Sequence, residues 1–436
     1  MRYVIIGGDA AGMSAAMQIV RHDENAEIIT LERGEIYSYA QCGLPYVIGG
    51  LISSTTDLIA RDVETFRHKY RIDARTKHEV TSVDLKNQIV SGVDFSLSYD
   101  KLLLATGASP IVPSWPGNDL QGIHTVKTIP DTEQLMADAK EKKHITIIGG
   151  GYIGLELAEN FIKIGKDVTI IEQAPQLAAS FDEDFSNMIL EEAEKNGMNV
   201  RLHETVEGFS GNERVERVIT DQASIRTNLV VVAIGVTPNT SFLSNSDLHF
   251  HRNGAVIVNR FMETNVENVY AAGDCATQYH RIKQKNDYIP LGTHANKQGR
   301  LAGKAMIGQP TPFQGIVGTS IIKFFSLTLG RTGLSSRELE ELSYPYNQMT
   351  TEIGHIASYY PGAERLTVRL CYHRETNQLL GGQIIGHAGV DKRIDVLSTA
   401  LYNEMKIDEL EHLDLAYAPP YNSVWDPIQQ TARRRE

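Results

Sequence analysis

Hydrophobic and polar positions along the chain repeat one local pattern twice. A short apolar run at residues 3–6 leads into a glycine-rich turn and then into small and apolar residues at 13–20. A second apolar run at 27–32 follows and ends in an acidic residue. Short apolar runs are typical of buried strands, and the segment between them is long enough for a helix. We therefore predict a strand, a glycine turn, a helix and a strand in the first part of the chain.

The same pattern recurs further along the chain. Residues 145–148 run into a second glycine turn, a helical segment at 155–165 and an apolar run that ends at Glu172. Two further apolar runs, at 101–110 and 229–240, each pass into a glycine and a proline. This internal duplication predicts an α/β protein with two Rossmann-like dinucleotide-binding folds, in which the second is inserted into the first.

The pattern of apolar and polar residues changes at about residue 316. Alternating apolar and polar stretches at 366–372 and 378–386 predict an antiparallel sheet, and residues 391–405 predict a helix. We expect a discontinuous first domain of residues 1–114 and 241–315, a second domain of residues 115–240, and a separate C-terminal α+β domain of residues 316–436.

Composition narrows the class of partner. The 436 residues carry 42 Lys and Arg against 54 Asp and Glu, a net charge of −12, which argues against nucleic acid or an anionic membrane as the main partner. Neither a membrane span nor a leader peptide is predicted. The three cysteines form no CxxC motif and the 14 histidines are scattered, so we expect a reducing cytoplasm and no metal site.

The second glycine turn reads Gly149-x-Gly151-x-x-Gly154 and opens a helix. These glycines allow the tight turn, the approach of a pyrophosphate and close packing of helix on strand. Glu172 ends the next strand, where an acid accepts hydrogen bonds from the adenosine ribose. Residues 173–176 after it contain no Arg or Lys to meet a 2′-phosphate, which favours NADH over NADPH.

The first glycine turn departs from this motif. Gly7 and Gly12 occupy the outer positions, but Asp9 stands where the middle glycine is expected. Glu32 again ends the following strand, and a Gly-Asp pair ends at Asp274. Two such folds together with this pair point to FAD in the first fold, with Asp274 binding the ribityl chain, although Asp274 is equally compatible with a helix N-cap.

Cys42 lies just after the strand that ends at Glu32, in the segment SYAQCGLPYVIGG. It precedes Gly-Leu-Pro and is expected to open a helix, whose dipole would stabilise the thiolate. A buried structural cysteine is the alternative, and we assign that role to Cys275 and Cys371.

These residues together resemble the pyridine nucleotide-disulfide oxidoreductases, and the resemblance covers essentially the whole chain. The lone Cys42 lacks the second cysteine of a CxxxxC motif, because position 47 is Val47. That leaves the single-cysteine branch, which contains coenzyme A disulfide reductases, NADH oxidases and NADH peroxidases. The oxidases and peroxidases carry a His where this chain has Ala10, and the segment 355–363, with its YYPG sequence, is similar to coenzyme A disulfide reductases.

The resemblance implies FAD, NADH (with NADPH possible), coenzyme A as substrate or bound mixed disulfide, and a homodimer held by the C-terminal domain. It implies a nucleophile and two proton-donating tyrosines that reach across the dimer: Cys42, Tyr359 and Tyr417. The residues expected at FAD are Gly7, Gly8, Ala11, Gly12, Glu32, Arg33, Val80, Thr106, Gly107 and Asp274. Those expected at NAD are Gly149, Gly151, Tyr152, Ile153, Gly154, Glu172 and Gly235. Those expected at coenzyme A are Ser14, Gln18, Arg21, Ser38, Gln41, Asn296 and Trp425.

The chain departs from the family at two basic positions. Tyr70, between Lys69 and Arg71, replaces one family lysine, and Trp425 replaces another and is expected to stack on adenine. The predicted activity is reduction of coenzyme A disulfide. A persulfide or polysulfide reductase, a water-forming NADH oxidase and a flavoprotein that only docks a partner are the alternatives.

Overall fold

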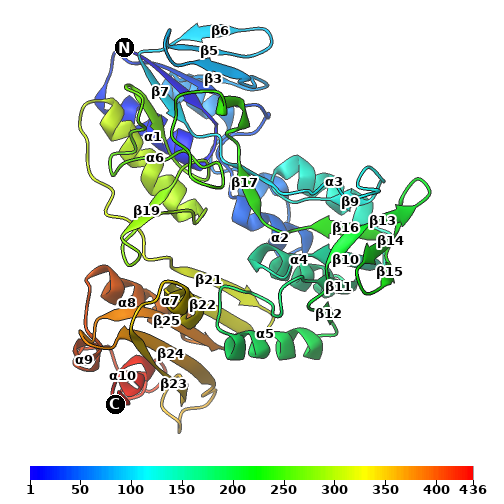
Figure 1. The fold of residues 1–436 in the computed structure, drawn as a ribbon, viewed down its shortest axis with the longest axis vertical. Coiled ribbons are helices and arrows are strands. Elements are labelled where there is room, and N and C mark those ends of the chain that lie inside the picture. The colour runs from blue at the N-terminus through cyan, green and yellow to red at the C-terminus, as the bar shows by residue number, and fades with distance from the viewer. Residues whose placement is uncertain (436) are drawn as a thin grey trace.

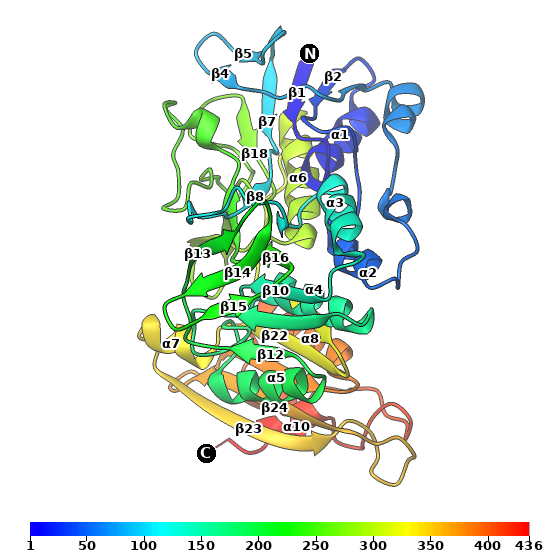
Figure 2. The ribbon, with the colours of Figure 1, turned by 90° about the vertical axis from the view of Figure 1, so that its right-hand side faces the viewer.

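The structure is a computed structural model that describes residues 1–435, and its three sheet-based regions follow one another along the long axis of the molecule (Figure 1). The N-terminal region lies at one end and the C-terminal region at the other. A quarter turn of the view shows the strands of the second region between them (Figure 2).

The N-terminal region is built on a parallel sheet with strand order β18-β7-β1-β2-β3. Four of the five strands are buried for most of their length, as expected for a parallel sheet that is covered on both faces, and only the edge strand β3 is not. The strands are β1 (Arg2–Ile6), β2 (Glu27–Leu31), β3 (Asp73–Arg75), β7 (Lys101–Leu104) and β18 (Val269–Ala271). Two long helices, α1 (Ala10–His22) and α6 (Gly292–Met306), pack against each other beside the sheet.

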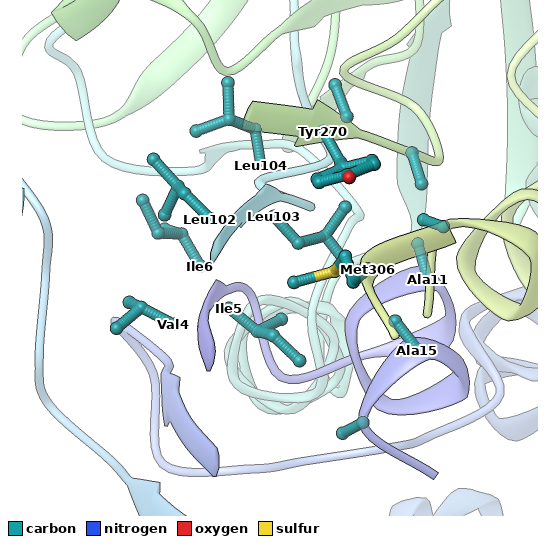
Figure 3. Close-up of a cluster of buried hydrophobic side chains, with 14 of the residues drawn as sticks. Val4, Ile5, Ile6, Ala11, Ala15, Leu102, Leu103, Leu104, Tyr270 and Met306 are labelled. Carbon is teal, nitrogen blue, oxygen red and sulfur yellow. The ribbon is translucent and has the colours of Figure 1, made fainter. Parts of the chain in front are cut away.

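Small residues allow α1 and α6 to approach closely. A Cβ added at Gly299 would lie 2.1 Å from the carbonyl oxygen of Ala11, and one at Gly303 would lie 2.6 Å from that of Ala15. Figure 3 shows these alanines and Met306 beside the buried strand residues Val4, Ile5, Ile6 and Leu102–Leu104. The close crossing fixes α1, and therefore the glycine turn that precedes it, against the sheet.

The second region repeats this architecture with strand order β12-β11-β10-β16-β9. Its strands are β9 (Ile123–His124), β10 (His144–Ile148), β11 (Asp167–Ile171), β12 (Asn199–Arg201) and β16 (Leu229–Val232). Its helices are α3 (Ile129–Ala139), α4 (Tyr152–Lys163) and α5 (Glu183–Lys195). A three-stranded antiparallel sheet adds β13 (Val206–Gly211), β14 (Val215–Thr220) and β15 (Ser224–Arg226), and β8 (Ala108–Pro110) pairs with β17 (Val236–Pro238) where the chain enters and leaves this region.

The C-terminal region is a five-stranded antiparallel sheet with order β21-β22-β25-β24-β23. Its strands are β21 (Ser320–Phe324), β22 (Leu327–Gly333), β23 (Tyr346–Gly354), β24 (Arg365–His373) and β25 (Leu379–Gly386). Its helices are α7 (Ser336–Glu341), α8 (Val390–Tyr402), α9 (Ile407–Glu411) and α10 (Pro427–Ala432).

Shorter elements complete the N-terminal region. They are the helical turns Gln41–Gly43, α2 (Leu44–Ile48), Thr55–Leu58, Thr65–Lys69 and Ser241–Leu243, and the strands β4 (Ser82–Asp84), β5 (Ile89–Ser91), β6 (Ser96–Ser98), β19 (Gln278–His280) and β20 (Lys285–Asp287).

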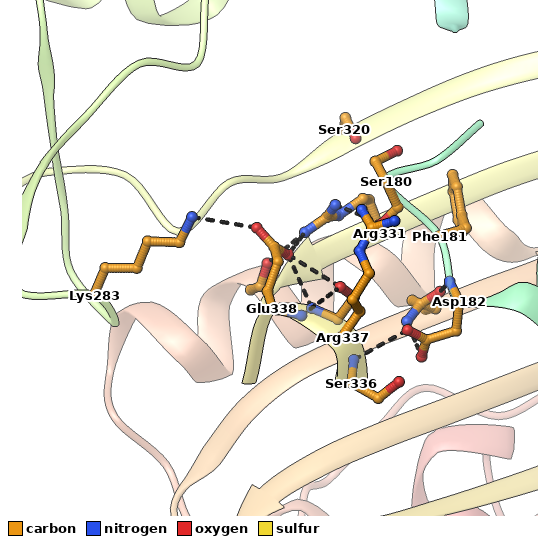
Figure 4. Close-up of polar contacts among 12 residues, drawn as sticks. Ser180, Phe181, Asp182, Lys283, Ser320, Arg331, Ser336, Arg337 and Glu338 are labelled. Atoms are coloured by element: carbon orange, nitrogen blue, oxygen red, sulfur yellow. Dashed lines mark hydrogen bonds and ion pairs between the residues drawn. The ribbon is translucent and has the colours of Figure 1, made fainter. Parts of the chain in front are cut away.

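A polar junction ties the three regions together (Figure 4). Glu338 of α7 accepts hydrogen bonds from Lys283 at 3.2 Å and from Arg331 at 2.6 Å. Arg331 also donates to the backbone carbonyl of Ser180, at 2.6 Å, in the segment that follows β11. The pKa of Glu338 falls to about 2 because these cations and a backbone N–H stabilise its carboxylate, although burial opposes them. The junction therefore fixes the C-terminal sheet against both dinucleotide folds.

The predicted fold class is confirmed, because both glycine turns lie between a parallel strand and a helix and the C-terminal sheet is antiparallel. The predicted helix at 391–405 corresponds to α8, which ends three residues earlier.

Candidate active site

The two glycine turns open into one large cavity of about 2070 Å³. Its wall includes Gly7 of the first turn, Gly149 of the second and the side chain of Cys42. Parallel sheets bind their ligands at the carboxyl ends of the strands, and both turns stand at such ends. The fold therefore places two dinucleotide sites and a thiol around a common space.

The first glycine turn is shaped to receive a phosphate group. Gly7 has φ of 118°, and a Cβ there would lie 2.1 Å from the carbonyl oxygen of Ala105. A Cβ at Gly12 would lie 2.0 Å from the carbonyl oxygen of Gly7. The carboxylate of Glu32 accepts backbone N–H groups from Gly8 at 2.9 Å and from Gly34 at 2.7 Å, which fixes it beside the turn. These residues fit FAD.

The other residues expected at FAD also surround this part of the cavity. The Thr106 hydroxyl donates to the carbonyl of Asn239 at 2.7 Å, and the Gly107 carbonyl accepts from the Asn239 N–H at 2.9 Å. The carboxylate of Asp274 lies 3.3 Å from the ammonium of Lys127. The cavity wall includes Gly8, Ala11, Arg33, Val80, Thr106, Gly107 and Asp274.

The second glycine turn has the same geometry. A Cβ at Gly154 would lie 2.0 Å from the carbonyl oxygen of Gly149, whereas a Cβ at Gly151 would meet no protein atom within 4 Å. Glu172 accepts N–H groups from Gly150 at 2.6 Å and Ala174 at 2.7 Å. The open side of Gly151 and the N-terminus of α4 leave room for a pyrophosphate, so these residues fit a nicotinamide dinucleotide.

Three more residues expected at NAD line the same cavity: Tyr152, Ile153 and Gly235. The Tyr152 hydroxyl is held by the hydroxyls of Ser320 at 2.8 Å and Ser180 at 3.0 Å. The contact with Ser320 connects α4, the helix of the second glycine turn, to the C-terminal sheet.

Cys42 lies in the middle of a single helical turn, Gln41–Gly43, and not at the start of a long helix. The following helix α2 has five residues, so few peptide dipoles are aligned behind the thiol. Cys42 is exposed to the cavity, but the partial desolvation of its thiol and the nearby Glu156 carboxyl raise the pKa of the thiol, and Lys127 opposes them. The expectation that a helix N-terminus lowers this pKa is therefore wrong in direction.

Asp9 explains the departure from the glycine motif. Its carboxylate accepts a hydrogen bond from the Gln41 side chain at 2.6 Å and from the Tyr39 N–H at 3.3 Å. Burial raises the pKa of Asp9 to about 6. The residue that replaces the middle glycine thus ties the first turn to the segment that carries Cys42. The sequence shows that Asp9 departs from the glycine motif, but it does not show this contact with Gln41.

Glu156 is a second residue that the sequence interpretation did not single out. It projects from α4 into the cavity and accepts a hydrogen bond from the hydroxyl of Tyr46 at 3.1 Å. Burial raises the pKa of Glu156 to about 7. Tyr46 and Glu156 are both close enough to Cys42 to interact with its charge.

A smaller pocket of about 470 Å³ adjoins the main cavity, and both share Ala10, Asn296 and Lys297 in their walls. Five residues expected at coenzyme A line this pocket: Ser14, Gln18, Arg21, Ser38 and Asn296. Gln41 lines the main cavity instead. The sequence interpretation missed three cations of the pocket, namely Arg61, Lys297 and Arg300.

The two tyrosines lie on the C-terminal region, where Tyr359 is 73% exposed and Tyr417 is 47% exposed. Their hydroxyls are 3.4 Å apart, and this contact raises the pKa of Tyr359. Trp425 is also exposed and carries the guanidinium of Arg433 at 4.4 Å from its ring centroid. None of these three residues belongs to the cavity wall around Cys42 in residues 1–435.

Within residues 1–435, no three His, Cys, Asp or Glu side chains are placed to hold a metal ion. No helix in this range is long and apolar enough to cross a membrane.

Two dinucleotide folds, a thiol on their shared cavity and a C-terminal sheet define a flavin-dependent NAD(P)H:disulfide oxidoreductase. Residues 1–299 match the family described as pyridine nucleotide-disulphide oxidoreductase, and residues 319–427 match its dimerisation domain. The chain belongs to this family, which typically uses FAD and NAD(P)H, and the predicted class of enzyme is confirmed.

Individual relatives differ in their stated activities. The NAD(P)H sulfur oxidoreductase (CoA-dependent) of Pyrococcus abyssi is 38% identical over 435 residues, covering 99% of this chain and 97% of that protein. The coenzyme A disulfide reductase of Staphylococcus aureus is 33% identical and covers 98% of both proteins. The water-forming NADH oxidase from Lactobacillus brevis, solved with NADH, has a TM-score of 0.96 at 30% identity, covering 99% of this chain and 97% of that chain.

Proposed function

We propose that the chain reduces coenzyme A disulfide with NADH through a mixed disulfide on Cys42. The overall reaction takes one NADH, one proton and one coenzyme A disulfide to NAD⁺ and two coenzyme A thiols. The hydride supplies the two electrons that the sulfur–sulfur bond accepts. One proton from solution, together with the hydrogen of the hydride, supplies the two thiol protons.

The observation that carries this proposal is the basic pocket beside the thiol cavity. Arg21, Arg61 and Arg300 line it together with Lys297, while the chain as a whole is acidic. Guanidinium groups bind phosphates in bidentate geometry, and coenzyme A carries several phosphates. The pocket shares Ala10 with the main cavity, so a ligand can hold its phosphates here and place its sulfur near Cys42.

FAD, when bound, would accept the hydride of NADH and pass two electrons to the Cys42 disulfide. Gly7, Gly12 and Glu32 would hold the FAD, and Gly151 and Glu172 would hold the NADH. Glu172 supports NADH over NADPH, because its carboxylate would repel a 2′-phosphate and residues 173–176 offer no cation. FAD would thus bind to the proposed first domain, residues 1–114 and 241–315. NADH would bind to the proposed second domain, residues 115–240.

Cys42 performs the sulfur chemistry. Its thiolate attacks one sulfur of coenzyme A disulfide, the sulfur–sulfur bond breaks, and the first coenzyme A leaves as a thiolate. Reduction of the resulting mixed disulfide by two electrons releases the second coenzyme A and restores the Cys42 thiolate. Lys127 stabilises this thiolate, since it is the cation that favours the ionised form of Cys42.

Tyr359 and Tyr417 would protonate the departing coenzyme A from a second subunit. Both are exposed on the proposed dimerisation domain of residues 316–436, away from the cavity of their own chain. A homodimer in which each C-terminal region faces the partner's pocket would bring the hydroxyls to the sulfur. Trp425 would then lie at the outer, adenine end of coenzyme A.

Steady-state NADH oxidation tests the proposal. The experiment compares four electron acceptors: coenzyme A disulfide, polysulfide, oxygen and hydrogen peroxide. Each is tested with the parent enzyme and with the Cys42→Ser variant, and Cys275→Ser is the matched control. We expect coenzyme A disulfide to be the fastest acceptor and Cys42→Ser alone to lose that activity by a hundredfold or more. Retention of disulfide activity in Cys42→Ser refutes the proposal.

Reduction of persulfide or polysulfide is the second candidate, favoured by the 38% identity to the CoA-dependent sulfur oxidoreductase. The same cavity and thiol serve both reactions. A polysulfide rate that exceeds the coenzyme A disulfide rate and requires added coenzyme A would select this candidate. The oxidase alternative is less well supported, because Ala10 stands at the family position of a His.

A further inference from the structure

The two exposed tyrosines come from separate segments of the C-terminal region. Tyr359 lies in the connection between β23 and β24, and Tyr417 lies in the tail between α9 and α10. Their hydroxyls nevertheless stand 3.4 Å apart. Exposed side chains on two irregular segments keep such a geometry only if buried contacts hold both segments in place.

A buried guanidinium connects the two segments. Arg393 of α8 is 1% exposed, and it donates to the backbone carbonyl of His355 at 2.7 Å and to the side-chain oxygen of Asn422 at 3.0 Å. Its remaining contacts are the carboxylate of Asp426, at 3.0 and 3.2 Å, and the carbonyl of Gly389, at 2.8 Å. A planar guanidinium with five N–H donors can join four such partners at once, and an ammonium cannot.

Two of these four partners, His355 and Asn422, lead to the tyrosine segments. His355 closes the loop that carries Tyr359: its N–H donates to the Glu364 carbonyl at 2.9 Å, and its ring Nδ1 accepts the Glu364 N–H at 3.0 Å. The Asn422 amide donates to the carbonyl of Ala416, the residue before Tyr417, at 3.1 Å. One hydrogen bond therefore connects Arg393 to the segment of Tyr359, and two hydrogen bonds, through Asn422, connect it to the segment of Tyr417.

We infer that Arg393 and Asn422 are positioning residues that hold Tyr359 and Tyr417 as a single unit against the partner subunit's disulfide site. This inference rests on the proposed function, since it gives both tyrosines a role at the departing thiol. Neither Arg393 nor Asn422 touches the substrate in this account. Their effect passes through the placement of the two hydroxyls.

The Asn422→Asp variant tests the inference with a side chain of nearly the same size and shape. Its carboxylate still accepts from Arg393, but it has no N–H to donate to the Ala416 carbonyl. The Tyr417→Phe substitution is made in the parent and in Asn422→Asp, and coenzyme A disulfide turnover is measured for all four proteins. We expect Tyr417→Phe to cost about tenfold or more in the parent and less than twofold in Asn422→Asp.

Two further measurements separate positioning from loss of structure. The rate at which NADH reduces the bound flavin, measured anaerobically in a single turnover, should be unchanged in Asn422→Asp. Gln383→Ala is the matched control, because it removes a buried amide of the same region that binds Asp182 at 2.6 and 2.9 Å without touching either tyrosine segment. In that control Tyr417→Phe should cost the same factor as in the parent.

The outcomes are distinguishable from failure of the proposed function. If Tyr417→Phe is costly and costs the same in Asn422→Asp as in the parent, the positioning inference is wrong and the proposed function stands. If neither Tyr417→Phe nor Tyr359→Phe lowers turnover in the parent, the tyrosine role falls and the inference falls with it. Dependence of turnover on Cys42 is unaffected by either result.

Discussion

Glu156 and Lys127 act on the Cys42 thiol in opposite directions. Glu156 raises the pKa of the thiol through its negative charge, and Lys127 lowers it through its positive charge. Both side chains reach the cavity from segments that are distant from Cys42 in sequence. The pKa of the nucleophile is therefore shifted by partial desolvation and by charged residues that are distant from it in sequence.

This balance predicts opposite shifts in two variants. Glu156→Gln keeps the shape and the hydrogen bond from Tyr46 but removes the charge, so the pKa of Cys42 should fall, whereas it should rise in Lys127→Met. The pH dependence of the alkylation rate of Cys42 by iodoacetamide measures both, with Cys42→Ser as the blank. Shifts of the same sign in both variants would contradict this electrostatic account.

The same carboxyl predicts a pH-dependent stability. The pKa of Glu156 is raised from 4.5 to about 7, so the folded state favours the protonated form and binds a proton that the unfolded state has lost. Its contribution to the free energy of unfolding is thus lost as pH rises from about 4.5 to 7. Urea unfolding at pH 5 and pH 8 measures this. The free energy of unfolding should decrease less between these pH values in Glu156→Gln than in the parent, and equal decreases would contradict the raised pKa of Glu156.

At the scale of elements, two glycines of the second turn differ in what an added methyl group would meet. A Cβ at Gly154 would clash with the Gly149 carbonyl, whereas a Cβ at Gly151 meets open space in the cavity. We predict that Gly151→Ala leaves the thermal midpoint unchanged and raises the KM for NADH by about tenfold, roughly 1.4 kcal/mol. Gly154→Ala should lower the midpoint as well. An unchanged KM in Gly151→Ala would exclude this turn as the NADH phosphate site.

The glycine turns also show which features could be predicted from the sequence. Gly149, Glu172 and the strands around them were predictable, because the motif, the helix and the terminal acid are neighbours along the chain. The tie from Asp9 to Gln41 and the cations Arg61 and Arg300 were not, since each depends on segments that only the fold brings together. The direction of the Cys42 pKa was missed for the same reason.

At the scale of the whole molecule, the junction around Glu338 connects the C-terminal sheet to both dinucleotide folds. Lys283, Arg331 and Ser180 come from three different regions and meet at or next to its carboxylate. Tyr152 of α4 hydrogen-bonds both Ser180 and Ser320, so the helix of the second glycine turn is fixed beside this junction. Weakening the junction should loosen the three regions together.

Glu338→Gln tests this role. The pKa of Glu338 is lowered from 4.5 to about 2, so its carboxylate stabilises the folded state above pH 4.5 and this contribution is lost as pH falls towards 2. We expect Glu338→Gln to cost about 3 kcal/mol in the free energy of unfolding at pH 7, and less at pH 3 to 4. Chemical unfolding at both pH values measures it, and a cost that grows on acidification would contradict the assignment.

The account as a whole depends on Cys42 forming a mixed disulfide with coenzyme A. The most direct measurement is anaerobic NADH oxidation by the enzyme with coenzyme A disulfide, together with a count of the thiols released. We predict two thiols for each NADH in the parent and no release above background in Cys42→Ser. Undiminished release in Cys42→Ser, or NADH oxidation in the parent that yields no coenzyme A thiol, would contradict the proposed function.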